Sequence, residues 1–322
     1  MTFEEAKKRK EELEKTMIEI PGVHGIGIGL TPESTEREFS IYIDVDTKEA
    51  AEKVSTVVRK MNRSDDDIIC KMEPAPTHHI GIVSEEEQET DHNGPDACLS
   101  DDELIPDRSR YRPVPGGVSI SAKKGYYGTF CTFVISKDEN DDRLYMLSNK
   151  HVFATIGNMV CQPVYDKRNR VGTVVRHADY TTQDAAIAEF TADRSNGSEN
   201  TIQDYGKIGG YRALTQDDLG KYVIKRGART RYTKGKIENI LYTTYLVDGS
   251  VVYDCVKIAA LDQTPTEKYV YSKSGDSGSP VIMEDEEKLV GLHFAGPASD
   301  SGEYGICCKI TNVFDSLNIM LP

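Results

Sequence analysis

The sequence lacks several features that define whole classes of protein. No apolar run approaches 20 residues, which argues against a membrane-spanning helix. The charged start MTFEEAKKRKEELEKTM lacks the apolar core of a secretory signal peptide. Basic residues are in the minority, 39 against 53 acidic ones with a net charge of −14, so phosphate backbones and anionic lipids are repelled. We expect a soluble, cytoplasmic protein that binds neither nucleic acid nor membrane.

The seven cysteines form no C-x-x-C pair, and their number is odd. This pattern indicates neither a zinc ribbon nor a complete disulfide framework. It favours a reducing compartment. We interpret the adjacent Cys307 and Cys308 as strand residues whose side chains point to opposite faces, rather than as metal ligands.

At 322 residues the chain is long enough for two or three domains, and the first is predicted over residues 1–83. Apolar residues at helical spacing predict a helix over residues 3–17, with Lys10 interrupting the apolar stripe. Alternating patterns predict strands in IPGVHGIGIGL and EFSIYIDVD, and DIICKM is a candidate third strand. Asp46 and Glu49 are spaced as in a capping box and predict the start of a second helix. We therefore predict a small α+β domain with a regulatory role.

Two adjacent histidines, His78 and His79, lie near the end of this first domain. Imidazole is a common metal ligand, but no cysteine or second histidine pair lies nearby in the sequence. We therefore interpret them as a solvated loop pair and expect no metal site.

The next stretch, residues 84–110, carries ten acidic residues against two arginines, so it supplies 2 − 10 = −8 of the net charge of −14. Such a composition buries too little apolar surface to offset its ordering entropy. We predict an acidic flexible linker over residues 84–112, with an autoinhibitory strap as the alternative. Removal of residues 1–110 is then expected to leave a folded domain.

From PVPGGVSIS at residue 113 the sequence changes to short β-rich runs separated by Gly, Asn and Asp turns. Runs such as GTFCTFVIS, NRVGTVVRH and KLVGLHFAG are typical of a β-barrel or β-sandwich. The final TNVFDSLNIML predicts a helix through Val313, Leu317 and Met320. The fold class is therefore mainly β, in a second domain over residues 113–322.

Within this domain, the stretch SKSGDSGSPVIM places Ser277 among glycines and one acid. A simple turn between strands is one interpretation, because Gly, Asp and Ser favour turns. The other is a nucleophile on a tight loop, with the backbone N–H groups of Gly275 and Ser277 forming an oxyanion hole.

Two candidate partners of Ser277 precede it in the chain. His151 ends the apolar run LYMLSNKHV, and Asp184 begins DAAIAEF. In isolation the histidine is equally a strand-end residue, and the aspartate a capping acid. The order His, Asp, Ser is that of the β-barrel peptidases, with separations of 184 − 151 = 33 and 277 − 184 = 93 residues. Together they predict a Ser-His-Asp triad.

On the motifs LSNKHVF, DAAIA and GDSGSP, residues 113–322 resemble a trypsin-like serine peptidase of the chymotrypsin fold. The opening IPGVHGIGIGL, followed later by PVPGGVSIS, is similar to the narrow-leaf group of these peptidases. The resemblance implies two β-barrels and His151, Asp184 and Ser277 as catalytic residues, with no metal or cofactor.

The sequence departs from secreted members of that family. Val152 and Lys273 stand where those members carry disulfide cysteines, which supports an intracellular version. There is no Ile-Val-Gly-Gly activation sequence, so Asp276 is not expected to await a newly cut N-terminus. Whether the oxyanion loop is preformed is then open.

The stretch VGLHFAG resembles the substrate-binding strand of the family. We expect it to pair with a peptide backbone through Phe294, Ala295 and Gly296. By the same resemblance, His293 points into the specificity pocket and donates a hydrogen bond to a Glu or Gln side chain, with Ser272 as a second donor. Tyr271 stands where trypsin has an acid, which disfavours cleavage after Lys or Arg. The alternative for His293 is a buried histidine bonded to a backbone carbonyl.

We therefore predict a serine endopeptidase that cleaves a protein substrate through an acyl-enzyme, in regulated signalling or defence. An inactive peptide-binding scaffold and an esterase are the alternatives. The sequence indicates no oligomeric state.

Overall fold

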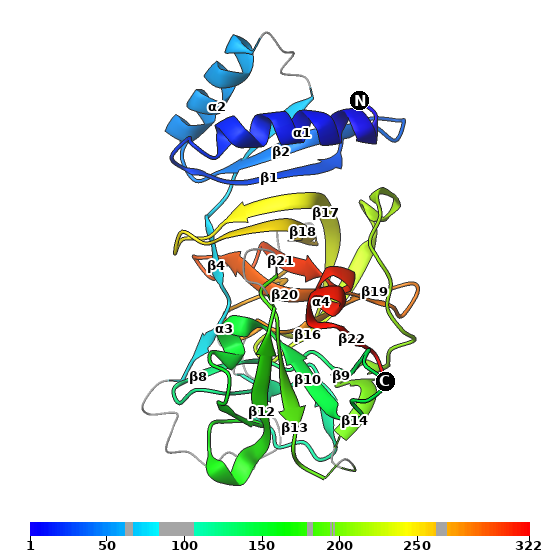
Figure 1. The fold of residues 1–322 in the computed structure, drawn as a ribbon. Coiled ribbons are helices and arrows are strands. Elements are labelled where there is room, and N and C mark those ends of the chain that lie inside the picture. The colour runs from blue at the N-terminus through cyan, green and yellow to red at the C-terminus, as the bar shows by residue number, and fades with distance from the viewer. Residues whose placement is uncertain (62–66, 84–105, 179–182, 194, 196, 262–268) are drawn as a thin grey trace.

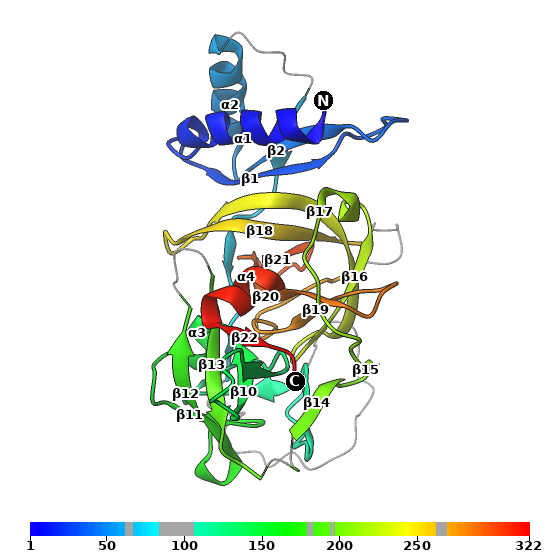
Figure 2. The same ribbon diagram turned by 45° about the vertical axis from the view of Figure 1, so that its right-hand side comes forward.

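The computed structural model describes residues 1–61, 67–83, 106–178, 183–193, 195, 197–261 and 269–322. Three parts are stacked along the molecule, with the N-terminal helices and strands at one end and two β-structures below them (Figures 1 and 2). The predicted mainly β, two-barrel architecture behind a small α+β region is confirmed. None of the described helices is long and apolar enough to cross a membrane.

The middle part is a closed barrel. Its strands are β16 (Tyr222–Gly227), β17 (Arg231–Tyr245), β18 (Val251–Ala260), β19 (Pro280–Met283), β20 (Leu289–Pro297) and β21 (Tyr304–Lys309). They pair in the order β16-β19-β20-β21-β18-β17, and the pairing of β16 with β17 closes the ring. On β21, Cys307 and Cys308 face different apolar cores, as the alternation of a strand predicts.

The lower part is the first barrel in chain order. Its main sheet runs β11 (Met159–Cys161), β12 (Arg170–His177), β13 (Ala186–Phe190), β10 (Leu144–Ser148), β9 (Phe133–Ser136) and β22 (Ile319–Met320). Smaller sheets flank it, formed by β5 (Gly81–Ile82), β8 (Tyr126–Thr129) and β7 (Ser119–Ile120), and by β15 (Gly206–Lys207), β14 (Gly197–Ile202) and β6 (Val114–Gly116). The short helix α3 (Lys150–Phe153) follows β10 directly, and 3-10 turns occur at Lys167–Asn169 and Gln216–Asp218.

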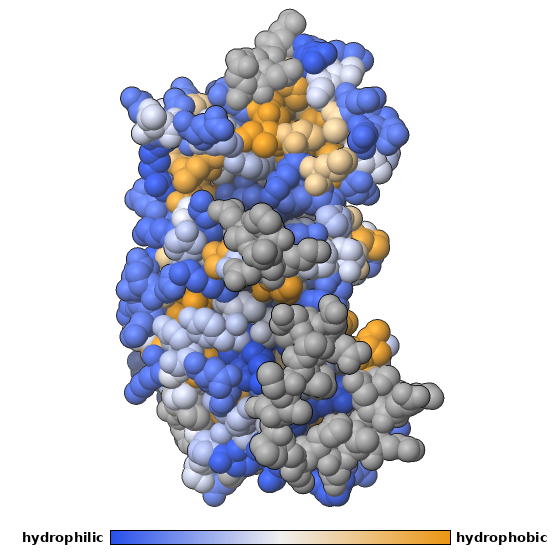
Figure 3. Space-filling model, turned by 180° about the vertical axis from the view of Figure 1, so that it is seen from behind, coloured by the Kyte–Doolittle hydropathy of each residue, from blue (hydrophilic) through white to orange (hydrophobic). Residues whose placement is uncertain are grey.

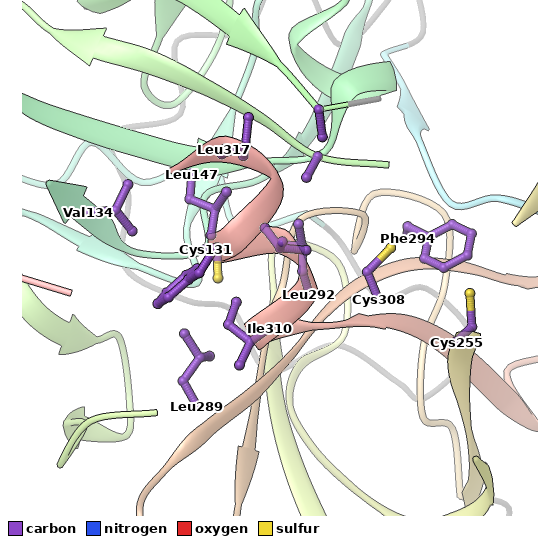
Figure 4. Close-up of a cluster of buried hydrophobic side chains, with 14 of the residues drawn as sticks. Cys131, Val134, Leu147, Cys255, Leu289, Leu292, Phe294, Cys308, Ile310 and Leu317 are labelled. Carbon is purple, nitrogen blue, oxygen red and sulfur yellow. The ribbon is translucent and has the colours of Figure 1, made fainter. Parts of the chain in front are cut away.

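The helix α4 (Ile310–Leu317) lies between the two barrels. Its buried face consists of Ile310, Val313, Phe314 and Leu317. In Figure 4, Ile310 and Leu317 lie among side chains from both barrels, such as Leu147 and Leu292. The helix ends at Leu317, earlier than the sequence predicts, because Asn318 takes a left-handed conformation and the chain continues as β22.

The N-terminal part consists of α1 (Phe3–Met17), β1 (Val23–Leu30), β2 (Phe39–Val45), α2 (Lys48–Lys60) and β3 (Ile68–Met72). Both predicted helices are present, although Thr47, not Asp46, caps α2 by accepting a hydrogen bond from the Ala50 N–H. Lys10 does not interrupt the buried face of α1. It is buried itself, and its ammonium donates to Thr243 Oγ1 at 2.9 Å.

The N-terminal sheet continues the sheet of the second barrel. Strand β1 pairs antiparallel with both β2 and β17, so β17 lies inside one extended sheet. A buried ion cluster lies at this junction: the Lys257 ammonium is 2.7 Å from Asp44 Oδ2 and also contacts the Glu73 carboxylate. Burial alone would lower the pKa of Lys257, but these carboxylates raise it well above its ordinary value. The division at residues 83 and 113 stays a prediction.

The stretch that was interpreted as a linker is described in part. Residues 84–105 lie outside the described residues. Beyond them, the Asp107 N–H donates to the carbonyl of Ala228 at 2.7 Å, and the Asp107 carboxylate pairs with the buried guanidinium of Arg226.

Figure 3, the view from behind, shows an apolar area on the N-terminal part within a mostly hydrophilic surface.

Candidate active site

The structure brings the three predicted catalytic side chains to the junction of the two barrels. His151 lies on α3 and Asp184 just before β13, both in the first barrel, whereas Ser277 lies just before β19 in the second. The Nδ1 atom of His151 is hydrogen-bonded to Asp184 Oδ2, and the His151 backbone N–H donates to Asp184 Oδ1 at 3.2 Å. These two bonds fix both the imidazole ring and the backbone of α3 against the carboxylate.

Asp184 is fully buried, and its charge is stabilised by its neighbours. Burial alone would raise the pKa of this carboxyl, but the adjacent His151 holds it below its ordinary value. The carboxylate can therefore orient one tautomer of the imidazole and stabilise its cation.

The hydroxyl of Ser277 does not point to His151 in this structure. It donates to the carbonyl oxygen of Phe294 at 2.9 Å. The Nε2 atom of His151 is buried and has no hydrogen-bond partner among the described residues. The atom that a nucleophilic serine would use is thus available.

The two backbone N–H groups predicted to form an oxyanion hole point at the same acceptor. The backbone N–H groups of Gly275 and Ser277 both donate to one oxygen, the carbonyl of His79, at 2.7 and 3.1 Å. Gly275 has φ +110°, and a Cβ atom there would lie 2.5 Å from the ring of Tyr127, so this loop requires glycine. Two donors aimed at a peptide oxygen are the arrangement that stabilises a developing oxyanion.

Asp276 is already paired. Its carboxylate lies 2.9 Å from the ammonium of Lys225, and both side chains are fully buried. The same carboxylate accepts hydrogen bonds from the Thr230 hydroxyl at 2.7 Å and from the Arg229 N–H at 2.9 Å. Because an internal cation satisfies Asp276, the loop before Ser277 has this shape without a new N-terminus.

The carbonyl oxygen that accepts from Gly275 and Ser277 belongs to a segment that crosses the whole site. Strand β4 (Pro76–His78) pairs antiparallel with β20 of the second barrel, with Ala295 opposite His78 and Gly296 opposite Thr77. Three residues on, β5 pairs antiparallel with β8 of the first barrel. Figure 1 shows β4 running beside the second barrel toward the end of the molecule that carries β8. We call residues 76–82 the cleft segment.

The side chain of His79 fills a closed pocket. It is fully buried, with Nδ1 3.2 Å from Ser272 Oγ and Nε2 3.3 Å from the carbonyl oxygen of Pro297. A Cβ atom at Gly296 would lie 2.2 Å from this imidazole, so the pocket depends on that glycine. The backbone N–H of His79 donates to Phe294 at 3.2 Å.

His293 and Tyr271 line the same pocket. The ring centroid of His293 is 5.7 Å from that of His79 and 6.1 Å from that of Tyr271. His293 is fully buried, and neither ring nitrogen has a hydrogen-bond partner among the described residues, so the bond to a backbone carbonyl is not observed. Burial and then the charge of Lys225 lower the pKa of His293 well below its ordinary value, which leaves a neutral ring.

His78 lies on the other side, against His151, with the ring centroids 4.3 Å apart. Its Nε2 is 3.5 Å from Asp184 Oδ2, so His78, His151 and Asp184 form a group of potential metal ligands within 4.8 Å of one another. Burial, followed by the nearby His151, lowers the pKa of His78 to about 4. The interpretation of His78 and His79 as a solvated loop pair was wrong, because His79 is fully buried and His78 is mostly covered and packs against His151.

Sequence reasoning therefore missed the cleft segment. The alternating end of the run THHIGIV is a weak strand signal, but nothing local in it specifies the partner. The pairing of His78 with Ala295 spans 295 − 78 = 217 residues.

Two barrels with a serine, a histidine and an aspartate at their junction define the chymotrypsin-like class of serine protease. A model of the trypsin family matches residues 107–317, more than half of the chain. The chain belongs to the trypsin family and is a trypsin-like serine protease. A search of curated proteins found no match.

Solved structures with the same fold support this assignment. A protease from Nocardiopsis superposes with a TM-score of 0.50 at 17% identity, covering 65% of this chain and 98% of its own. A glutamic acid specific serine protease that uses a histidine triad in substrate binding superposes with a TM-score of 0.51 at 18% identity, covering 65% and 100%. At these identities the similarity concerns the fold.

Proposed function

We propose that this protease is a serine endopeptidase in which Ser277 is the nucleophile, His151 the general base and Asp184 the residue that orients the base. The observation that carries the proposal is a peptide carbonyl held by the N–H groups of Gly275 and Ser277, directly beside the serine hydroxyl. The site thus binds an extended peptide in the manner that acyl transfer requires.

The chemistry follows from the contacts. Rotation of the Ser277 side chain away from the Phe294 carbonyl frees its hydroxyl to donate to the unpartnered Nε2 of His151. His151 takes the proton as the oxygen attacks the substrate carbonyl, while Asp184 stabilises the imidazolium. The proton then passes to the leaving amine, and water hydrolyses the acyl-enzyme.

The pocket around His79 supports a preference for side chains that accept or donate hydrogen bonds. The free nitrogens of His293 are available to such a side chain, and Ser272 Oγ, which donates its own proton to the Tyr304 carbonyl at 3.1 Å and is therefore not the second donor expected from the sequence, can accept from it. A lysine or arginine would meet Lys225, whose ammonium lies 5.4 Å from the centre of the Tyr271 ring. We expect cleavage after Gln, Glu or His. The use of histidines to bind substrate by the glutamic acid specific protease is consistent with this.

An esterase would use the same triad. The antiparallel pairing of β20 with a peptide strand favours the peptidase, because an ester substrate offers no such strand. Burying the charge of Asp184 costs free energy. An inactive peptide-binding scaffold would have no need of the hydrogen-bonded pair of His151 and Asp184 that requires this burial, so the pair favours an active enzyme.

A cleft already filled by the protein's own chain fits regulated cleavage of one partner protein, in signalling or defence, better than digestion. The free thiols at Cys131, Cys161, Cys255, Cys307 and Cys308 are all buried. They support the proposal that the protein works in the reducing cytoplasm.

The test compares hydrolysis of matched peptides that carry Gln, Glu, His, Leu or Arg before the scissile bond. We expect Ser277→Ala to abolish hydrolysis and His293→Ala to flatten the ranking in which Gln, Glu and His lead. A chelator should leave the rate unchanged. Equal hydrolysis by wild type and Ser277→Ala would overturn the proposed function.

A further inference from the structure

We propose that the protein cleaves its own chain between His79 and Ile80. The inference rests on the proposed peptidase function and goes beyond it, because it names a processing site within this chain. The cleft segment lies in the site as a substrate does, and the bond after His79 is the bond that Ser277 would attack.

The backbone of the cleft segment supplies the first argument. The His79 N–H donates to the carbonyl oxygen of Phe294 at 3.2 Å. The carbonyl oxygen of His79 in turn accepts from the N–H groups of Gly275 and Ser277. The N–H groups of Gly275 and Ser277 both donate to this carbonyl and to no other described one, so it is the carbonyl that they polarise. A peptide held by these three bonds presents its carbonyl carbon next to the serine.

The direction of the chain supplies the second argument. Residues before the bond pair with β20, on the barrel that carries Ser277, and residues after it pair with β8, on the barrel that carries His151. The leaving nitrogen of Ile80 is therefore on the side of the base that must protonate it. The side chains of His79 and His78 fix the register, one in the pocket with Ser272 and the other against His151.

The reaction balances as an ordinary hydrolysis. Ser277 Oγ bonds to the His79 carbonyl carbon, its proton moves to His151, and the C–N bond to Ile80 breaks as that proton reaches the new amine. Water then cleaves the ester, which restores Ser277 and leaves a carboxylate on His79. The products are residues 1–79 and 80–322.

The two products should stay together. Strand β1 remains paired with β17, and Asp44 and Glu73 remain bound to the buried ammonium of Lys257. The cut would free the segment after residue 79 from the cleft, while β4 stays tethered as a bound product. Cleavage therefore changes what blocks the site without separating the N-terminal part.

The experiment uses the full chain, synthesised in a cell-free system and followed by intact mass and N-terminal sequencing. Wild type is expected to yield a fragment that begins Ile-Gly-Ile-Val and a partner that ends at His79, and Ser277→Ala is expected to stay intact. The fraction cleaved at a given time should not change over a 100-fold dilution, because both groups belong to one molecule.

Ile80→Pro tests the site without touching the catalytic side chains. A tertiary amide with a ring at the leaving nitrogen is expected to lower cleavage at least about 100-fold. The control Ile18→Ala, a half-exposed side chain at the end of α1, should cleave at the wild-type rate within twofold. Under non-denaturing conditions the two fragments of the cleaved chain should stay together as one particle of the native size.

Peptide hydrolysis by the same preparations separates the two proposals. Ser277-dependent hydrolysis of added peptides, together with a chain that stays intact after His79 or is cut elsewhere, would overturn self-cleavage alone. Cleavage of Ser277→Ala at the wild-type rate would overturn it as well. Absence of both activities would overturn the proposed function and, with it, the self-cleavage.

Discussion

The ammonium of Lys225 lies 2.9 Å from the carboxylate of Asp276, the residue directly before Ser277, and neither side chain is exposed. Asp276 also accepts from the backbone N–H groups of Arg229, Thr230 and Lys273. Burial would raise the pKa of this carboxyl, yet Lys225 and the surrounding donors keep it far below its ordinary range. The pair anchors the loop that carries the N–H groups of Gly275 and Ser277.

The first prediction concerns this pair. Lys225→Met leaves a buried carboxylate without its cation, which costs about 3–5 kcal/mol in comparable cases. We expect that loss in chemical denaturation, together with loss of peptidase activity, because the loop can no longer hold the two N–H groups. Lys207→Met, at an exposed lysine on β15, is the control and should change neither measurement. A fully active Lys225→Met would show that the pair does not shape the loop.

The second prediction concerns access to the cleft. His79→Gly removes a fully buried side chain from its pocket, and such truncations cost roughly 2–5 kcal/mol of binding energy. The cleft segment should then leave the site more often, and an added peptide should be hydrolysed at least about tenfold faster. Met72→Gly removes an exposed side chain shortly before the segment and should leave the rate unchanged. An unchanged rate of peptide hydrolysis in His79→Gly would mean that the cleft segment does not limit the entry of substrate.

The third prediction is a loss of stability in mild acid. The folded pKa of His78 is about 4, below its value near 6.5 when unfolded, and burial lowers the pKa of His79 and His293 in the same direction. The unfolded chain therefore binds more protons between about pH 6.5 and 4, so stability is complete above that window and falls within it. Asp184 and Asp248, which face His78, raise its pKa, but by less than burial lowers it.

His78 alone contributes about 3 kcal/mol across the window, which is the lower limit of the effect, because His79 and His293 act in the same direction. Urea denaturation at pH 7.5 and pH 4.5 should show a fall of at least that order. In His78→Phe the fall should be smaller by a comparable amount. An equal free energy of unfolding at both pH values would contradict the buried, neutral state of these histidines.

The fourth prediction concerns the N-terminal part. Asp44, Glu73 and Glu238 together neutralise the buried Lys257, so Asp44→Asn should destabilise the chain by about 3 kcal/mol. The control Asp46→Asn lies two residues on, at an exposed position, and should be silent. Adding Lys257→Met to Asp44→Asn should restore most of the loss, because the remaining carboxylates, Glu73 and Glu238, both keep Lys71 as a partner. If the double variant is as unstable as Asp44→Asn, the ion cluster is not the cause.

These contacts also replace an expectation drawn from the sequence. A chain without residues 1–110 was expected to fold because few contacts should cross the acidic stretch. It would lose two of the three carboxylates around Lys257, keeping only Glu238 at 3.3 Å, and expose the edge of β17 that β1 covers. We now expect that truncated chain to be unstable unless Lys257 is also replaced.

The sequence was sufficient where the signal is local. The helical spacing of Ala6, Leu13 and Met17 predicts α1, and the compact motif around Ser277 predicts a tight loop whose N–H groups at Gly275 and Ser277 share one acceptor. The order of His151, Asp184 and Ser277 predicts that they meet at the junction of the barrels, because the fold is fixed by the regular β-runs around them.

It was insufficient where a residue's role depends on a distant partner. Lys225 lies in the strand run KYVIKRG and carries no local sign that its ammonium is buried against Asp276, 51 residues later. His78 and His79 are polar residues near an acidic stretch, so their burial follows only from pairing with β20. Local patterns do not encode such tertiary pairings.

The most direct measurement maps the residue that reacts with a fluorophosphonate, by peptide mass spectrometry, in His79→Gly and in His79→Gly with His151→Ala. A hydroxyl attacks this probe only when a base takes its proton. We predict a single adduct, on Ser277, and a rate of labelling lower by a factor on the order of 10⁴ without His151. An adduct on another residue, or equal labelling of the two variants, would contradict the account of Ser277 as a nucleophile activated by His151.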